Sequence, residues 1–166
     1  RNVVFPNGSW VNFWTGEKVQ GGTTSNVSAD KSTIPLFLRS GAVMPVRLNS
    51  DFNFGTSLSD EDIINALMLT SAEETRNITV YESETVSENY TVSKTADGGT
   101  SVKAQDGSTV RMFILKGVKA SSVTVDGNAL STKSVNPTSQ NSGFRISGND
   151  TYVYLPEGEW SEISFN

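Results

Sequence analysis

The chain has 166 residues, of which 36% are hydrophobic and 19% are charged, and its formal net charge at pH 7 is −5. It contains neither cysteine nor histidine, which excludes disulfides, thiolate or imidazole nucleophiles, and metal sites built on these ligands. Its acidic balance disfavours nucleic acid as a partner, and no apolar run is long enough to cross a bilayer, so we expect no membrane partner either.

The first 45 residues are dense in strand and turn signals. The chain opens directly in a strand-like segment without a signal-peptide pattern, so we interpret it as part of a longer polypeptide. Pro6 ends the first strand because it has no N–H group to donate to a neighbouring strand. Gly8 supplies a turn, and Gly16 and Gly41 mark places where the backbone bends or passes close to a neighbour.

A doubly buried strand, a loop and a short helix are expected next. Residues 34–38 carry apolar side chains on both faces, which is typical of a strand buried on both sides. The polar segment 49–59 is typical of a loop. Ser59 can cap a helix over Asp60–Leu67, whose acidic first turn suits the helix dipole and whose Ile63, Ile64 and Leu67 would form a buried stripe.

From residue 67 onward, short apolar runs alternate with turn signals. The two-residue period of half-buried strands recurs in residues 78–80, 90–92, 110–114 and 123–125. Asp-Gly pairs at 97–98, 106–107 and 126–127 supply the positive φ angles that tight hairpin turns require. The polar stretch 82–88 predicts a domain boundary, and 135–143 predicts a surface loop. These features predict sandwiches rather than βαβ units.

The two ends of the chain carry similar segments. Residues 4–10 (VFPNGSW) and 154–160 (YLPEGEW) each have a strand ending at proline, a P-x-G turn, and a second strand that opens with tryptophan. We interpret the similarity as a common hairpin device rather than as domain duplication.

The order of short motifs in residues 3–45 resembles the segment that follows the catalytic barrel in glycoside hydrolase family 31. The shared elements are Pro6-x-Gly8-x-Trp10, Phe13-Trp14-Thr15-Gly16-Glu17, Gly21-Gly22, Ile34-Pro35-Leu36-Phe37-Leu38-Arg39-Ser40-Gly41-Ala42 and Met44-Pro45. Residues 67–69 and 78–82 are similar to the family's paired strands, although Ser83 and Glu84 replace an acidic pair and the following glycine is missing. Residues 123–128 resemble the distal β-sandwich of many members.

The resemblance implies an all-β chain of two antiparallel β-sandwich domains in tandem, with at most one or two short helical segments. The proximal domain would cover residues 1–82 and the distal one residues 83–166. Family members are retaining enzymes that cleave or transfer α-linked glucosyl or xylosyl units with two Asp residues on a (β/α)8 barrel, about 5 Å apart. This chain has no counterpart of the barrel, so the resemblance assigns it no catalytic residue, metal or cofactor.

The resemblance instead implies a supporting role. We expect the chain to pack on the catalytic barrel of its own family 31 parent, with a seam around Trp14 and Phe37. The residues expected to serve interdomain packing are Pro6, Gly8, Trp10, Phe13, Trp14, Gly16, Pro35, Phe37, Arg39 and Gly41.

Two other functions stay open at this point. Trp10, Trp14, Tyr152, Tyr154 and Trp160 could stack on sugars, which would make the chain a carbohydrate-binding module that tethers the enzyme to polysaccharide. Such residues more often fill a core or an interdomain seam. A surface adhesin unrelated to glycosidases is the other alternative, and the ordered motif series argues against it.

Acidic residues and sequons give weaker signals. The adjacent carboxylates at 60–62 and 73–74 point apart, which favours a solvated helix start and a surface turn over an acid/base pair. The Asp-Gly loops lack the Asp-x-Asp-x-Asp-Gly series of a calcium site. About three sequons are expected by chance in a chain so rich in Ser and Thr, so the five present favour an extracellular or cell-surface location only slightly. The sequon asparagines are Asn7, Asn26, Asn77, Asn89 and Asn149.

Overall fold

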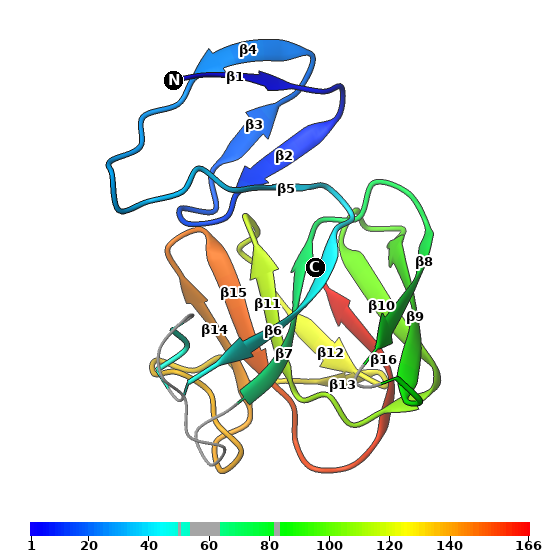
Figure 1. The fold of residues 1–166 in the computed structure, drawn as a ribbon. Helices are drawn as coiled ribbons and strands as arrows, with labels where there is room; N and C mark the ends of the chain where they lie inside the picture. The colour runs from blue at the N-terminus through cyan, green and yellow to red at the C-terminus, as the bar shows by residue number, and fades with distance from the viewer. Residues whose placement is uncertain (50, 54–63, 82–83) are drawn as a thin grey trace.

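The protein folds into β-strands joined by loops and turns (Figure 1). The computed structural model describes residues 1–49, 51–53, 64–81 and 84–166; these residues contain no helix, and hence no helix that could cross a membrane. The all-β class predicted from the sequence is confirmed. The strands are β1 (Asn2–Phe5), β2 (Ser9–Asn12), β3 (Lys18–Gln20), β4 (Thr23–Asn26), β5 (Phe37–Arg39), β6 (Val43–Leu48), β7 (Ile64–Thr70), β8 (Arg76–Tyr81), β9 (Ser87–Lys94), β10 (Thr100–Ser108), β11 (Met112–Lys116), β12 (Val123–Val125), β13 (Asn128–Ala129), β14 (Gly143–Ser147), β15 (Asp150–Tyr154) and β16 (Trp160–Phe165).

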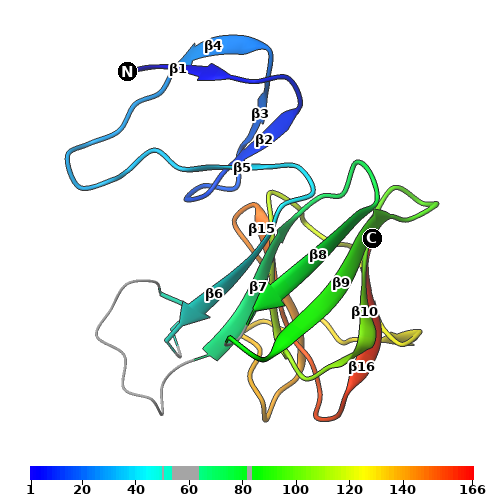
Figure 2. The same ribbon diagram turned by 45° about the vertical axis from the view of Figure 1, so that its right-hand side comes forward.

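Residues 1–39, here called the N-terminal unit, form two small sheets at one end of the molecule (Figures 1 and 2). Strand β1 pairs with β4, while β2 lies between β3 and β5. Its strands are only three or four residues long, and it buries few large apolar side chains: Phe5, Val11, Phe13 and Leu38. A layer with so small a core depends on its neighbours for stability.

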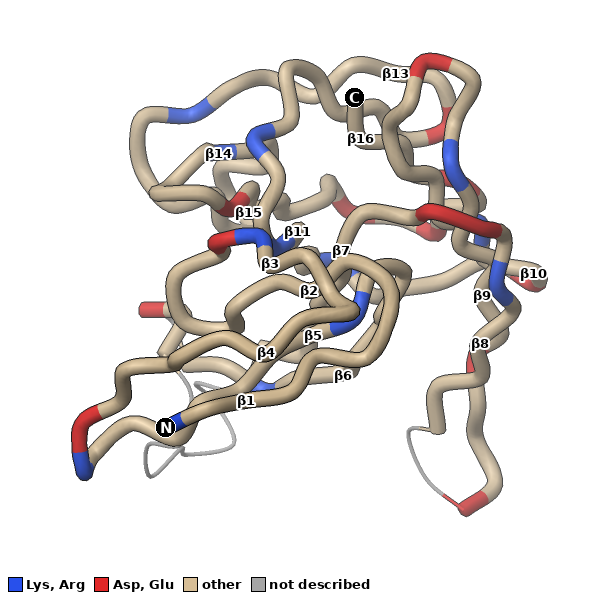
Figure 3. Tube along the Cα trace, turned by 90° about the horizontal axis from the view of Figure 1, so that it is seen from above, with Lys and Arg blue, Asp and Glu red and all other residues tan. Residues whose placement is uncertain are grey.

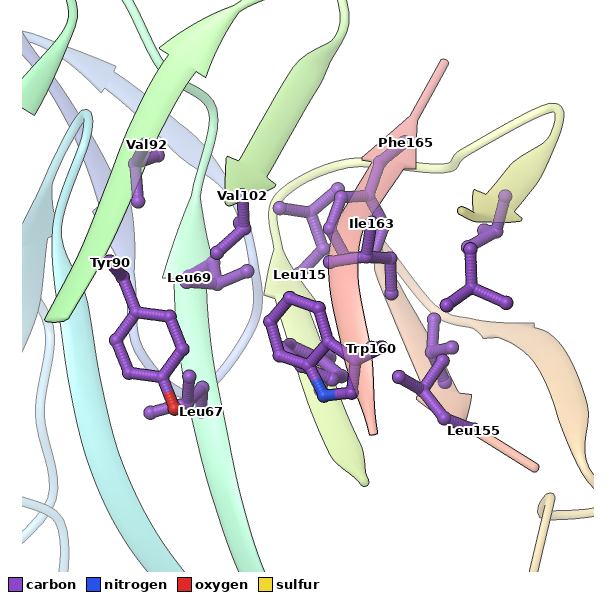
Figure 4. Packing of buried hydrophobic residues seen from close by; sticks show 14 of the residues in the cluster. Leu67, Leu69, Tyr90, Val92, Val102, Leu115, Leu155, Trp160, Ile163 and Phe165 are labelled. Atoms are coloured by element: carbon purple, nitrogen blue, oxygen red, sulfur yellow. The ribbon is translucent and has the colours of Figure 1, made fainter. Parts of the chain in front are cut away.

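Strands β6 to β16, within residues 43–166, form two larger sheets, here called the sandwich. One sheet has the strand order β13-β12-β16-β10-β9-β8, and the other has the order β14-β15-β11-β7-β6. Most neighbouring strands run antiparallel, as predicted, but β7 and β11 are parallel. The core between the sheets contains large aliphatic and aromatic side chains from both (Figure 4), among them Leu67, Leu69, Tyr90, Val92, Val102, Leu115, Leu155, Trp160, Ile163 and Phe165.

The five-stranded sheet is also buried on its other face. A second cluster there contains Met68 and Met112 and extends to Phe13 and Leu38 of the N-terminal unit. Strands β7 and β11 are therefore covered on both sides, which explains their nearly continuous apolar sequences. The second cluster also joins the N-terminal unit to the sandwich.

The predicted division between residues 82 and 83 does not coincide with a break between sheets. Strands β8 and β9, on either side of it, are paired neighbours over six residue pairs, and β7 lies beside β11. The core cluster between the sheets draws residues from both sides of the division. Within the predicted stretch, Ser87 and Glu88 belong to β9, so the strands on its two sides are neighbours in one sheet. The break between groups of sheets lies between β5 and β6.

The predicted helix is not found where the structure describes its residues. Residues 60–63 lie outside the described residues, as do residues 54–59 of the predicted loop. Residues 64–67 belong to β7, so the helix prediction is wrong there. Pairing of β7 with β6 on one side and β11 on the other outweighs the local helical pattern.

Two of the three Asp-Gly turn predictions are confirmed. Asp97-Gly98 connects β9 to β10, and Asp126-Gly127 connects β12 to β13 with both residues at positive φ. Asp106-Gly107 lies inside β10, where the pairing with β16 shifts register between Lys103 and Ser108. There the positive φ of Gly107 serves an irregularity within a strand rather than a hairpin.

The hairpin interpretation of the two P-x-G segments is wrong. Strands β1 and β2 belong to different sheets, and so do β15 and β16. Gly8 and Gly158 nevertheless have nearly the same backbone, with φ of 119° and 118°. Both segments are crossings from one sheet to another.

Candidate interdomain contact surface

The turn after β2 fixes the position of Trp14. The side-chain oxygen of Asn12 accepts hydrogen bonds from the backbone N–H groups of Trp14 (2.8 Å) and Thr15 (3.2 Å). Gly16 closes the turn by donating its N–H to the Asn12 carbonyl at 2.9 Å, with a φ of 69°. The turn is therefore held by its own hydrogen bonds, and Trp14 projects from it.

Trp14 forms an exposed apolar patch with two residues of the segment before β5. Its Nε1 donates to the carbonyl oxygen of Ile34 at 2.8 Å, and the N–H of the neighbouring Phe13 donates to the carbonyl of Leu36 at 2.9 Å. The exposed fractions are 49% for Trp14, 76% for Ile34 and 40% for Leu36. These three residues are called the apolar patch below. Exposed groups of large apolar side chains often mark contact surfaces.

Other motif residues serve the N-terminal unit itself. The ring of Phe37 meets that of Phe5 edge-on with 4.8 Å between the ring centres, and the centre of the Trp10 ring lies 6.1 Å from that of Phe5. The Trp10 Nε1 donates to the carbonyl oxygen of Pro6 at 2.9 Å, which ties the tryptophan to the first P-x-G crossing. Phe37, Trp10 and Pro35 are half-buried.

The passage from the N-terminal unit into the sandwich is fixed at Arg39 to Ala42. The Thr70 hydroxyl donates to the Arg39 carbonyl at 2.8 Å, and Gly41 donates its N–H to the carbonyl of Ser71 at 2.8 Å. Gly41 has a φ of 75°, and an added Cβ there would lie 3.3 Å from Nε of Arg76. The motif glycine thus allows a turn in contact with β8.

A buried ion pair lies where the N-terminal unit meets the sandwich. Lys116 and Asp150 form it, and their side chains are only 6% and 7% exposed. Asp150 Oδ1 also accepts the backbone N–H of Gly117 at 2.9 Å. The Lys116 ammonium also lies 5.8 Å from the centre of the Phe13 ring, which belongs to the N-terminal unit. This is a cation–π geometry.

The Gly16 turn rests directly on this pair. A Cβ added to Gly16 would lie 2.4 Å from Asp150 Oδ1 and 2.9 Å from the Cβ of Asn149. The Asn149 amide donates to the carbonyl of Thr15 at 3.1 Å. Sequence reasoning identified Gly16 but missed Lys116 and Asp150. The one available signal was a lysine at the end of the apolar run of β11.

The aromatic residues considered for sugar stacking do not form one platform. Trp160 is only 3% exposed, lies stacked 6.1 Å from Tyr90 and meets Phe113 edge-on at 5.2 Å, so it has no free face for a sugar. Tyr152 and Tyr154 contact the second cluster, on the other face of the five-stranded sheet. The part of the sugar-stacking prediction that concerns Trp160 is therefore wrong.

Tyr152 is half-buried, and its ring stacks on that of Phe52 at 5.7 Å with 7° between the ring planes. Burial raises the pKa of Tyr152 above the ordinary 10.0, and the negative charge of Asp150 adds to the rise, while Arg145 acts in the opposite direction. The phenol therefore keeps its proton to a higher pH than an exposed tyrosine does.

The acidic residues in the described part of the chain make no metal site. No group of three or more potential ligand side chains occurs there. Glu74 pairs with Arg76 at 2.5 Å and Glu73 is exposed, in agreement with the predicted surface turn. Residues 60–62 lie outside the described residues.

Comparisons with known proteins agree with the motif series. Residues 1–44 match the family described as the glycosyl hydrolase family 31 C-terminal domain. The chain is similar to alpha-glucosidase 2 of Bacillus thermoamyloliquefaciens (38% identity over 61 residues, covering 37% of this chain and 7% of the relative) and to the alpha-xylosidase of Saccharolobus solfataricus (57% over 37 residues, covering 22% and 5%). The chain thus matches only a small part of the length of these relatives.

The fold extends the likeness to the whole chain. The cycloalternan-forming enzyme from Listeria monocytogenes, solved in complex with a pentasaccharide substrate, superimposes with a TM-score of 0.82 at 21% identity. The match covers 100% of this chain and 17% of that enzyme. Both the N-terminal unit and the sandwich therefore have a counterpart in one larger solved chain.

Proposed function

We propose that this chain, a C-terminal region of the glycoside hydrolase family 31 type, is a non-catalytic support that packs on the catalytic barrel of its own polypeptide. The parent would hydrolyse or transfer α-linked glucosyl or xylosyl units. The names of the similar proteins, an alpha-glucosidase and an alpha-xylosidase, support this class of parent activity.

The observation that carries the proposal is the apolar patch of Trp14, Ile34 and Leu36. All three lie within the segment that matches the family, and they are exposed in the chain by itself. Covering them would remove apolar surface from water, which is favourable. The patch also belongs to the N-terminal unit, whose core is smaller than that of the sandwich. This unit therefore gains the most stability from packing on a large neighbour.

The charge distribution of the N-terminal unit supports a contact of this kind. Figure 3 looks down on this unit, and most of its trace carries no charged residue. The charged residues of the unit are Arg1, Glu17, Lys18, Asp30, Lys31 and Arg39. Depletion of charge at the centre and enrichment in aromatic residues distinguish protein interfaces from other surface.

Oxidative footprinting of Trp14 tests the contact. We expect Trp14 to be oxidised readily in the isolated chain and to be protected in the longer polypeptide that includes the barrel. Tyr81 is exposed and lies on β8 outside the patch, so it serves as the control and is expected to react equally in both forms. Equal oxidation of Trp14 in the two forms would contradict the proposed contact.

Activity of the isolated chain is a second test. We expect no turnover of maltose, isomaltose or p-nitrophenyl α-glycosides, because the only buried carboxylate in the described residues, that of Asp150, is paired with Lys116. Turnover that persists through successive purification steps would refute the non-catalytic role. Titration calorimetry with dextran and xyloglucan oligomers addresses the carbohydrate-binding alternative, for which we expect no measurable heat.

A further inference from the structure

Besides the hydrogen bonds from Asn149 to Thr15 and from Thr70 to Arg39, two kinds of interaction hold the N-terminal unit on the sandwich. One is apolar: Phe13 and Leu38 join Met68 and Met112 in the second cluster. The other is the buried ion pair of Lys116 and Asp150 beneath the Gly16 turn. We propose that this pair is an orientation lock, which selects one orientation of the N-terminal unit on the sandwich, and that Asp150 is its central positioning residue.

The Asp150 carboxylate is held from three directions. Lys116 binds one oxygen, and the N–H of Gly117 binds the other at 2.9 Å. The Gly16 turn closes the third side, where even a methyl group would overlap the carboxylate oxygen. A charged group confined in this way has no equivalent second position.

Close approach from the sandwich side depends on Gly117. Its φ is 70°, and an added Cβ would lie 2.9 Å from both the carbonyl oxygen of Gly16 and Cγ1 of Val11. Two glycines, one on each side of the contact, thus leave the space in which the turn rests on the ion pair. The turn can take this position only if the two units are correctly aligned.

The energetics favour orientation over stability as the role of the pair. Apolar contacts are non-directional, so the second cluster by itself tolerates sliding of one unit on the other. Removing two charges from water costs several kcal/mol per ion, and apolar residues of similar size often stabilise a protein as well or better. Both residues of the pair belong to the sandwich, so a shift of the N-terminal unit would leave the pair formed. Such a shift would instead separate the Phe13 ring from the Lys116 ammonium and the Thr15 carbonyl from the Asn149 amide, and these contacts are directional.

The lock is a property of this chain alone and does not require that the barrel is the partner. If the proposed function also holds, the lock sets the direction in which the apolar patch is presented. The footprinting of Trp14 compares the unchanged sequence with and without the barrel, whereas the lock is tested by variants of this chain alone, so the two proposals can be refuted separately.

Distance measurement between spin labels tests the proposal directly. The chain has no cysteine, so labels can be introduced by Val4→Cys on β1 and Ile146→Cys on β14, both at exposed positions. We expect a narrow distance distribution by double electron–electron resonance in the otherwise unchanged chain. Asp150→Asn should at least double its width. Glu162→Gln, which alters the exposed pair with Lys103, should leave the width unchanged.

A double variant separates orientation from stability. We expect Lys116→Met combined with Asp150→Val, which replaces the pair by apolar residues of similar size, to keep a melting temperature close to that of the unchanged chain but to show the broad distance distribution. A narrow distribution in this variant would overturn the lock, since apolar packing alone would then fix the orientation. A narrow distribution in Asp150→Asn would overturn it equally. If Asp150→Asn fails to fold, the double variant decides.

Discussion

Replacement of Gly16 by alanine tests the close contact between the N-terminal unit and the sandwich. With a φ of 69°, alanine at this position costs about 1–2 kcal/mol of backbone strain. The added Cβ would also lie 2.4 Å from Asp150 Oδ1, and the carboxylate cannot move away without loosening its bonds to Lys116 and Gly117. Loss of a hydrogen bond at a buried charged group costs about 1.5–3 kcal/mol, so we expect a total of about 2.5–5 kcal/mol.

Gly127→Ala is the matched control. Gly127 has a φ of 78°, and an added Cβ would meet nothing within 4 Å, so this variant isolates the backbone strain. Both free energies of unfolding can be measured by denaturant titration, or by thermal unfolding, where about 2–4 °C corresponds to each kcal/mol in a chain of this size. We expect Gly16→Ala to lose about 1.5–3 kcal/mol more than Gly127→Ala. Equal losses would refute the inference that the Gly16 turn rests on a fixed carboxylate.

A second prediction compares a buried tryptophan, Trp160, with an exposed one, Trp14. In denaturant titrations, Trp160→Ala should lower the free energy of unfolding by about 3–5 kcal/mol, and Trp14→Ala should lower it by less than half of that. A larger loss at Trp14 would contradict its assignment to a surface patch. Because the pKa of Tyr152 is raised, the folded state holds its proton more tightly, and the free energy of unfolding should fall as pH rises from about 10 through the folded pKa. In Tyr152→Phe, the free energy of unfolding should no longer show this decrease above pH 10. A pH profile identical to that of the unchanged chain would contradict the assignment of the decrease to Tyr152. The Ser32 hydroxyl and backbone N–H both donate to the Asp30 carboxylate and lower its pKa below 3.8. Ser32→Ala should therefore raise the pKa of Asp30 in an NMR titration of its carboxyl group, and an unchanged pKa would contradict this prediction.

Local features were predictable where the backbone conformation itself carries the information. Asp126-Gly127 forms the predicted turn because positive φ at two successive residues suits a tight hairpin. The same dipeptide at 106–107 lies within β10, because the partner strand β16 decides whether the chain turns or bulges. The two P-x-G segments likewise share a glycine φ, but whether their flanking strands pair depends on residues far away in the sequence.

The candidate site was predictable only in part for the same reason. Trp14 and Gly16 belong to a motif that is contiguous in sequence, so both were identified. Lys116 and Asp150 meet because β11 pairs with β15, with Leu115 opposite Thr151, and this register is set by the whole five-stranded sheet. A single lysine and a single aspartate that lie 34 positions apart in the sequence give no local signal of such a contact.

Two of the sequons have a structural explanation that does not involve glycosylation. Asn77 and Thr91 are cross-strand partners on β8 and β9, and so are Thr79 and Asn89. The Thr91 hydroxyl donates to the Asn77 side chain at 2.9 Å, and the Thr79 hydroxyl donates to that of Asn89 at 2.7 Å. Each Asn-x-Thr triplet thus supplies one half of two side-chain pairs, a type of contact that stabilises antiparallel strands.

The parallel pairing of β7 with β11 has a consequence for how the chain folds. Residues 71–111, which include β8, β9 and β10, lie between these two strands in sequence, so the intervening strands must turn back before the central pair can meet. Closing such a long loop before its contacts form slows folding. We expect the β8–β9–β10 meander, with its local contacts, to form early and the two central strands to join late. Until they do, the apolar sequence of β7 has a free edge, which makes partly synthesised or truncated chains prone to aggregation.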